Sequence, residues 1–277
     1  MKNSPIKWSG SKKSQAKEII SFFPNKIKTY HECFLGGNNI LYDLLSSDIK
    51  IENIELSDID NNLMTLWLTI KLEPNKLSEH YNELWSKFNN SSSNLIQNRK
   101  DFFYETKENF NKNPNSYDFL FLMRTCFNGL IRYNKKGEFN TSCHFTRPGI
   151  EPSKLSKLIF EWSELLKKHE VNINCCSYEK ITPKEGDFVY FDPPYHKANS
   201  MYQGNFVFEE FLKWMNELKC GFALSYDGKR GNSDLTQNII FNKEYQHYYI
   251  KSGNSSFSRL KGDNKVDVYE SLYIIKK

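Results

Sequence analysis

The chain has few of the features that mark secreted, metal-binding or membrane proteins. Its six cysteines include no C-x-x-C pair, and Cys175 and Cys176 are adjacent, which suits neither a simple disulfide nor a zinc site. No apolar run reaches the roughly 18 residues of a membrane span, and the start of the chain lacks the apolar core of a signal peptide. We therefore expect reduced thiols in a cytoplasm, no membrane partner and no bound metal.

Size and charge restrict the function only loosely. The 277 residues are 39% hydrophobic and 26% charged, with a net charge of +5. This length is enough for one large domain, or for a core domain with a subdomain. A mildly basic chain is compatible with a nucleic-acid partner but does not require one.

Strand and helix patterns alternate at both ends of the chain. Near the start, strand-like runs cover 29–34 and 54–58, and helical patterns cover 14–22, 40–45 and 62–72. From residue 171 onward a helix is predicted over 209–218, and strands are predicted over 171–177, 188–192, 222–227, 245–250 and 266–275. This alternation predicts an α/β domain with a parallel sheet, formed by 1–73 and 171–277. The stretch between them, 74–170, is mostly helical by periodicity and predicts an insertion.

One short stretch combines a carboxylate, two prolines and an aromatic ring. Asp192-Pro193-Pro194-Tyr195 directly follows an apolar, strand-like run. Consecutive prolines cannot continue a ladder because neither carries an N–H, so the chain leaves the sheet there in a stiff turn. The turn holds a carboxylate, proline carbonyls without a local donor, and a ring. Such a group can accept two hydrogen bonds from an amine and stack on a flat base; the alternative is a plain strand–loop junction.

A glycine-rich turn and a second carboxylate suggest a nucleoside cofactor. Gly36 and Gly37 follow the first predicted strand and precede a helix, where glycine lets a ligand approach the backbone closely. Asp58 ends the second strand, and a carboxylate at that place typically accepts both hydroxyls of a ribose. The turn is not a full G-x-G-x-x-G, and the sequence has no G-x-x-x-x-G-K-[ST] phosphate loop. An adenosine cofactor without a pyrophosphate therefore fits better than a dinucleotide or ATP.

Four separated blocks of sequence resemble the motifs of one known family. They are Ile6–Lys12, Glu32–Gly37, Arg124–Asn140 and Asp192–Tyr195. In this order they resemble the K-W-x-G-x-K segment, the E-P-F-x-G-x-G turn, the long recognition signature and the catalytic tetrapeptide of Dam-like DNA adenine-N6 methyltransferases. The recognition signature ends in a hairpin-like stretch with a Lys-Lys-Gly turn.

The resemblance implies a Rossmann-like, S-adenosylmethionine-dependent methyltransferase sheet with a mostly helical DNA-recognition insertion that carries a β-hairpin. It implies double-stranded DNA as the partner, with the target adenine flipped out of the stack. Asp192 and the Pro193 carbonyl would accept the two N–H bonds of the target amine, and Tyr195 would stack on the base. S-adenosyl-L-methionine would bind without a metal and leave as S-adenosyl-L-homocysteine, held by Trp8, Lys12, Phe34, Gly36, Asp58, Tyr178 and Asp192.

The resemblance also assigns DNA contacts to the recognition signature. Phe127 is either a core residue or an aromatic wedge in the duplex, and the resemblance favours the wedge. Arg132 is expected to make a bidentate contact with a guanine edge. Lys135 and Lys136, at the turn, are expected to contact phosphates. Either capping of local backbone or phosphate binding is expected of two asparagines, Asn128 and Asn134.

The chain departs from the family pattern at four positions. Cys33 stands where the family often has proline, and Asn38 where it often has a third glycine. Ser177 stands where the family often has an aspartate near the cofactor's adenine. Ser142 replaces the usual proline of the recognition hairpin, so the family's frequent GATC specificity does not transfer directly.

Two alternatives to adenine methylation stay open from the sequence. A cytosine-N4 methyltransferase would use the same tetrapeptide chemistry, which serves any exocyclic amine. A catalytically silent DNA-binding relative would bind the cofactor without transferring a methyl group. The resemblance also makes a cognate restriction endonuclease a candidate partner, in a bacterial or phage-infected cell.

Overall fold

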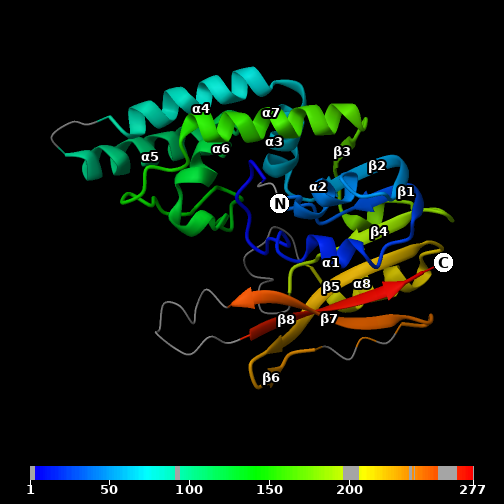
Figure 1. Cartoon of the computed structure of the whole chain (residues 1–277). Coiled ribbons are helices and arrows are strands. Elements are labelled where there is room, and N and C mark those ends of the chain that lie inside the picture. Colours follow the sequence, from blue (N-terminus) through cyan, green and yellow to red (C-terminus); the bar gives the residue numbers. More distant parts are fainter. Residues whose placement is uncertain are drawn as a thin grey trace.

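One mixed sheet forms the centre of the computed structural model, which describes residues 4–90, 94–195, 206–236, 239, 241–254 and 267–276 (Figure 1). Its order is β3-β2-β1-β4-β5-β8-β7, and β6 pairs with β5. The strands are β1 (Lys26–Glu32), β2 (Lys50–Asp58), β3 (Asn172–Cys175), β4 (Phe188–Phe191), β5 (Gly221–Arg230), β6 (Ser233–Asp234), β7 (Gln246–Asn254) and β8 (Asp267–Ile275). Neighbours among β1 to β5 are parallel, whereas β8 is antiparallel to β5 and β7. The predicted Rossmann-like sheet is therefore confirmed, with an added antiparallel edge.

The helices follow the predicted alternation closely. Those around the sheet are α1 (Ala16–Ile20), α2 (Asn39–Leu45), α3 (Asn61–Leu72) and α8 (Phe208–Glu217). Those of the insertion are α4 (Pro74–Phe88), α5 (Leu95–Lys112), α6 (Ser116–Thr125) and α7 (Pro152–Lys168), with short 3-10 turns at Phe127–Gly129 and Tyr178–Lys180. Among the described residues, no helix combines the length and the apolar character that crossing a membrane requires.

Strand β4 shows that both faces of the sheet are covered. Its four residues are all buried. Phe188 and Tyr190 belong to the core on one face, and Val189 and Phe191 belong to the core on the other. Successive side chains of a strand point to opposite faces, so a central strand with two covered faces requires an uninterrupted apolar run. Helix α8 covers the second face with buried side chains that include Phe211.

The helical insertion packs onto α3 and shares the core of the first face. Helix α6 buries every residue from Phe119 to Met123, so it is apolar all round and lies at the centre of this group. Helix α7 packs against α3 and α4, and α4 to α7 lie together on one side of the sheet (Figure 1). Buried residues of the insertion and of the sheet form one continuous core. The mostly helical character predicted for 74–170 is confirmed.

The sheet brings the predicted motifs to one edge. The strand order reverses between β1 and β4, which are parallel neighbours. In open α/β sheets, ligands bind at the carboxyl ends of the strands where the order reverses. Here β1 ends at Glu32, β2 ends at Asp58 and β4 ends at Phe191. The glycine turn, the second carboxylate and the Asp192–Tyr195 turn therefore meet at this point.

Candidate active site

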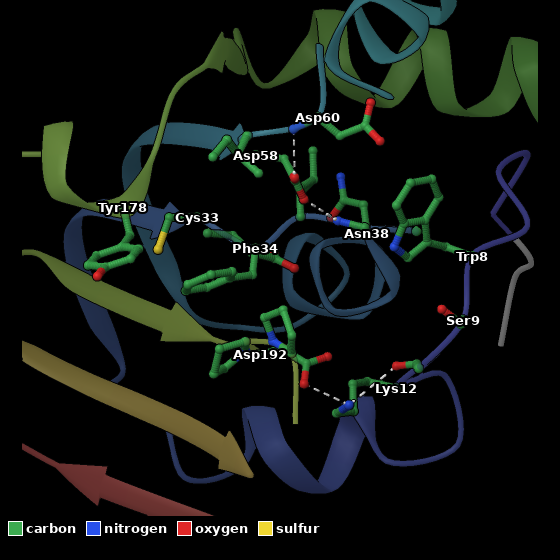
Figure 2. A pocket seen from close by; sticks show the side chains of 18 of the residues that line it. Trp8, Ser9, Lys12, Cys33, Phe34, Asn38, Asp58, Asp60, Tyr178 and Asp192 are labelled. Atoms are coloured by element: carbon green, nitrogen blue, oxygen red, sulfur yellow. Dashed lines mark hydrogen bonds and ion pairs between the residues drawn. The ribbon is translucent and has the colours of Figure 1, made fainter. Parts of the chain in front are cut away.

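A cavity of about 500 Å³ lies at the carboxyl ends of β1, β2 and β4. This volume is within the usual range of small-molecule sites. The structure brings every residue predicted for catalysis or cofactor binding to its wall, namely Trp8, Lys12, Phe34, Gly36, Asp58, Tyr178, Asp192, Pro193 and Tyr195. Figure 2 shows several of them around the cavity, with Trp8 and Tyr178 on opposite sides.

Asp192 is held by an ion pair from the amino-terminal segment. The Lys12 ammonium lies 2.8 Å from Asp192 Oδ1 (Figure 2), and it also donates to the carbonyl of Gly10 at 3.2 Å. The Lys12 side chain is 5% exposed and that of Asp192 is 19% exposed. Lys12 also lies 5.1 Å from the centre of the Tyr195 ring. The carboxylate therefore has a fixed position but remains open to the cavity.

The charges in this cluster act on one another. Burial raises the pKa of Asp192 to about 6, although Lys12 opposes this shift. Burial alone would lower the pKa of Lys12, but the nearby carboxylates outweigh it and raise that pKa above its ordinary value. Lys12 is therefore charged at neutral pH, and Asp192 is mostly ionised there. An ionised carboxylate in a partly dry site is a strong hydrogen-bond acceptor.

The turn after β1 is shaped by contacts that exclude a side chain at Gly36. This glycine has φ of +48°, and a Cβ on it would lie 2.9 Å from Cδ1 of Trp8. Its carbonyl accepts a hydrogen bond from the indole of Trp67 at 3.1 Å. Only glycine fits this backbone conformation and this close approach of the Trp8 ring. The sequence turn therefore forms as predicted.

Asp58 ties the turn to the end of β2. Its Oδ2 accepts the Gly36 N–H at 3.2 Å and its Oδ1 accepts the Asp60 N–H at 3.1 Å (Figure 2). Burial raises the pKa of Asp58 to about 6, although these backbone hydrogen bonds oppose the shift. Each carboxylate oxygen can accept a second hydrogen bond, so Asp58 can still bind hydroxyls of a ligand. Asp60 caps helix α3 by accepting from Leu63 N at 3.1 Å.

Aromatic and apolar side chains line another part of the cavity wall. Phe34 and Tyr178 stack with ring centres 5.8 Å apart. Ile59, directly after Asp58, also lines the cavity and is 51% exposed. A flat heterocycle can pack on such surfaces. These side chains line the same cavity as the carboxylate of Asp58, so the wall suits a nucleoside whose ribose reaches Asp58.

The side-chain amide of Asn38 also indicates that the cavity binds a polar ligand. Its side chain is 1% exposed and lines the cavity. Within the described part of the chain, neither its amide oxygen nor its amide nitrogen has a hydrogen-bond partner. Buried amides nearly always have partners. A polar ligand group in the cavity would satisfy this one.

The predicted wedge residue lies outside the core. Phe127 follows helix α6 and is 51% exposed, so its interpretation as a core residue is wrong. Its ring stacks on His144 with centres 5.2 Å apart, and its N–H donates to the Ser142 carbonyl at 2.8 Å. Asn128 is exposed and left-handed, with φ of 55°. An exposed ring on a fixed backbone is the form that an intercalating side chain requires.

The hairpin of the recognition signature is present but irregular. Its two sides form a single bridge, between Tyr133 and Phe139. The ladder is short because side chains take the next two donors: the Arg132 N–H donates to the Thr141 hydroxyl and the Glu138 N–H donates to Asn134. On the outer side, Asn111 of α5 binds both the N–H and the carbonyl of Phe139. Asn134 accepts from the N–H groups of Lys136 and Glu138, at 2.9 and 3.0 Å, so it caps local backbone.

The cations expected to meet DNA lie on the surface of this hairpin. Arg132, Lys135 and Lys136 are exposed. Gly137, with φ of +78°, closes the turn. The structure thus leaves the three side chains free of the core, as contacts with a duplex require.

Glu32 and Glu270 are carboxylates of the cavity wall that received no role from the sequence. Glu32 is 3% exposed, accepts the Tyr30 hydroxyl at 2.9 Å, and has its pKa raised to about 8 by burial. Glu270 comes from β8 and accepts the Tyr195 hydroxyl at 2.9 Å. A carboxylate in the middle of the predicted strand 266–275, beyond the polar start at Asp267, was the signal that could have identified Glu270.

No group of three or more potential metal ligands is found in the described residues. The cysteines Cys33, Cys126, Cys143, Cys175, Cys176 and Cys220 are all free thiols.

Comparisons with known proteins identify the family. The family model of D12 class N6 adenine-specific DNA methyltransferases matches residues 8–265. The Type II methyltransferase M.MjaIII of Methanocaldococcus jannaschii is 31% identical, over 96% of this chain and 96% of its own. A DNA adenine methylase of Vibrio cholerae is 30% identical, over 69% of this chain and 64% of its own. The Type II methyltransferase M.FokI of Planomicrobium okeanokoites is 23% identical, over 95% of this chain but 42% of its own.

A solved structure, the rRNA methyltransferase aviRa from Streptomyces viridochromogenes, aligns with 94% of this chain and 82% of its own at 12% identity and a TM-score of 0.34. The family match decides between the two amines that the tetrapeptide permits, and it selects adenine N6 over cytosine N4. The chain belongs to the D12 class N6 adenine-specific DNA methyltransferase family and is an enzyme that methylates adenine in DNA.

Proposed function

We propose that the cavity binds S-adenosyl-L-methionine together with a flipped adenine of double-stranded DNA, and that Asp192, Pro193 and Tyr195 carry out the transfer. The observation that supports this most is the placement of Asp192. It is fixed by Lys12 at 2.8 Å at the end of β4, in the same cavity as Gly36 and Asp58. The methyl acceptor and the cofactor would thus meet in one enclosed space.

The residues of the cavity wall offer a contact for each part of the proposed cofactor. Asp58 would accept the ribose hydroxyls, and Phe34 and Tyr178 would pack near the adenine ring. Gly36 leaves the space that a side chain would fill beside Trp8. The unsatisfied amide of Asn38 would bind a polar group of the ligand. When bound, S-adenosyl-L-methionine supplies an activated methyl group and becomes S-adenosyl-L-homocysteine.

The residues of the Asp192–Tyr195 turn would prepare the target amine. Asp192 and the Pro193 carbonyl would accept hydrogen bonds from the two N–H groups of the amine. These hydrogen bonds would withdraw the nitrogen lone pair from conjugation with the ring. Tyr195 would stack on the base and fix its orientation. Most of the rate acceleration would come from positioning and from the fixed charge of Asp192. Lys12 would contribute by keeping that carboxylate ionised.

The recognition signature would hold the duplex. Phe127 would fill the gap that the flipped base leaves, and Arg132 would read a guanine edge. Lys135 and Lys136 would bind phosphates, and Asn128 would join them from the left-handed turn beside Phe127. Asn134 would act indirectly, by fixing the turn that carries the two lysines.

A cognate restriction endonuclease is a further proposed partner, because several relatives are Type II methyltransferases or modification methylases by name. A methylase of such a pair protects the host's own DNA from cleavage. Because its substrate is DNA, we expect the enzyme to act in the cytoplasm. Co-expression with a candidate endonuclease tests the pairing, since a cognate methylase must abolish cleavage of host DNA.

Substitution of Asp192 tests the assignment of the site. Asp192→Ala should abolish formation of N6-methyladenine in a duplex that the wild type methylates, while S-adenosyl-L-homocysteine still binds by calorimetry. Asp234→Ala, which removes an exposed carboxylate on β6, is the matched control and should retain activity. Normal turnover in Asp192→Ala would show that the catalytic site lies elsewhere.

A further inference from the structure

Glu270 lies at a bulge where β5 and β8 pair. Tyr226 is opposite Ser271, but Lys229 is opposite Tyr269, so one extra residue of β5 enters the ladder at this point. Asp227 and Gly228 therefore face the single residue Glu270. Gly228 has no space for a side chain, since a Cβ on it would lie 2.4 Å from the Tyr269 carbonyl oxygen. Bulges of this kind redirect a side chain and often occur next to active sites.

The carboxylate of Glu270 reaches the Asp192–Tyr195 turn. Oε2 of Glu270 accepts the Tyr195 hydroxyl at 2.9 Å and lies 3.4 Å from the Lys12 ammonium. The Glu270 side chain is 19% exposed and lines the cavity. The two donors beside Asp192, the ammonium and the phenol, thus converge on one oxygen of a second carboxylate. Glu270 is not one of the residues that the proposed mechanism uses.

We propose that Glu270 is a positioning residue for methyl transfer, which holds the Tyr195 hydroxyl and shares the Lys12 ammonium with Asp192, so that Asp192 keeps an oxygen free to accept the target amine. This inference rests on the roles proposed above for Asp192 and Tyr195. Without Glu270, the Tyr195 hydroxyl would turn toward Asp192 and occupy an oxygen that the amine needs, and Lys12 would pair with Asp192 alone. The Tyr195 ring would also lose the hydrogen bond that sets its angle toward the base.

The charges around Asp192 give this arrangement a measurable signature. The groups that act on Asp192 are Lys12 from the amino-terminal segment, Glu270 from β8, Tyr195 and Tyr190 from the chain around β4, and Glu32 at the end of β1. Burial has the largest effect and raises the pKa of Asp192. Lys12 lowers this pKa, and the charge of Glu270 raises it further. Removing the charge of Glu270 must therefore lower the pKa of Asp192.

The test is the pH dependence of the single-turnover rate of methyl transfer, measured with the full chain and duplex DNA. In Glu270→Gln, the acid limb should move to lower pH, while the plateau rate should fall about 10- to 100-fold, the scale of a small misplacement. Glu270→Asp keeps the charge but shortens the side chain, so the plateau should fall with less movement of the limb. Asp267→Asn removes a half-exposed carboxylate from the same strand and should leave both quantities unchanged.

A double-mutant cycle separates positioning from general destabilisation. Because Tyr195 and Glu270 act through one hydrogen bond, the rate losses of Tyr195→Phe and Glu270→Ala, each of which removes that hydrogen bond, should be strongly non-additive. Melting temperature and S-adenosyl-L-homocysteine binding establish that each variant is folded; if Glu270→Ala is not, the cycle is measured with Glu270→Asp. An unmoved acid limb or additive losses would overturn the inference. If Asp192→Ala were active instead, the proposed function itself would fail, so the two failures are distinguishable.

Discussion

The ammonium of Lys12 and Oδ1 of Asp192 lie 2.8 Å apart, so the segment before α1 and the turn after β4 are joined by one ion pair. Both side chains are largely buried. A buried charge that loses its partner is strongly disfavoured. The protonation state of Asp192 thus depends on a residue of the amino-terminal segment, far from it in the sequence.

Lys12→Met should shift the activity of the enzyme toward alkaline pH. Lys12 lowers the pKa of Asp192, which is about 6 in the intact site. Without the lysine, that pKa rises, so a smaller fraction of the enzyme carries the ionised acceptor at neutral pH. The acid limb of the single-turnover pH profile should move upward, and raising the pH should partly restore the rate. Lys17→Met, at an exposed position of α1, is the control; an equal loss at every pH would contradict this role.

Asp58→Ala should weaken cofactor binding without removing the catalytic carboxylate. Asp58 fixes the Gly36 turn, and we propose that it also binds the ribose. The expected loss is about 1–3 kcal/mol, the typical cost of leaving hydrogen bonds to a charged group unmade. Calorimetric titration with S-adenosyl-L-homocysteine measures it. Asp48→Ala, an exposed carboxylate before β2, should bind normally, and unchanged affinity in Asp58→Ala would refute the assignment.

Arg132→Ala and Lys136→Ala should have different effects on DNA binding. Loss of a bidentate base contact should cost about 1–3 kcal/mol at one base pair and relax discrimination there. Loss of a phosphate contact at the turn should weaken binding to all duplexes alike and reduce the salt slope by about one unit. Binding to cognate and singly substituted duplexes at several salt concentrations separates the two effects. If Arg132→Ala weakened binding to every duplex equally, Arg132 would contact the DNA backbone rather than a base.

Phe127→Ala should impair methylation most when the target adenine is paired. The ring is 51% exposed and would fill the space that the flipped base leaves. A mismatched base is easier to flip than a paired one, so a mismatch opposite the target adenine should recover much of the lost rate. Phe160→Ala removes another exposed ring, on α7, and should have no such effect. Equal losses on paired and mismatched duplexes would argue against a wedge.

The sequence predicted the parallel part of the sheet because its signals are local. β4 is an apolar run that ends at a Pro-Pro turn, and β2 ends at a carboxylate followed by a capped helix. Strand starts were predicted less well. β1 begins at Lys26 and β2 at Lys50, since those polar first residues pair with each other, Lys26 opposite Lys50. Pairing of this kind is a tertiary property that no single run of sequence carries.

The parts of the site that escaped prediction depend on long-range packing. Glu270 reaches Tyr195 because β8 pairs with β5, where Glu270 lies opposite the bulge of β5. The stack of Phe127 on His144 depends on the chain returning to the same place after the hairpin. Asn134 had two equal interpretations, and its two hydrogen bonds to the turn decide for backbone capping. The individual residue roles remain predictions.

The amino-terminal segment, residues 4–12, contacts both the recognition signature and the cavity. The Ser4 carbonyl accepts a hydrogen bond from Arg124 at the end of α6, and the Lys7 side chain packs against Gly129. A few residues later, Trp8 lies against Gly36 and Lys12 holds Asp192. A ligand that fixes the segment 4–12 at the cofactor side also fixes it at the DNA side, and such linkage is reciprocal. Cofactor and duplex should therefore increase each other's affinity by the same factor. S-adenosyl-L-homocysteine, which differs from the cofactor only by the methyl group, should also raise the affinity of the enzyme for DNA.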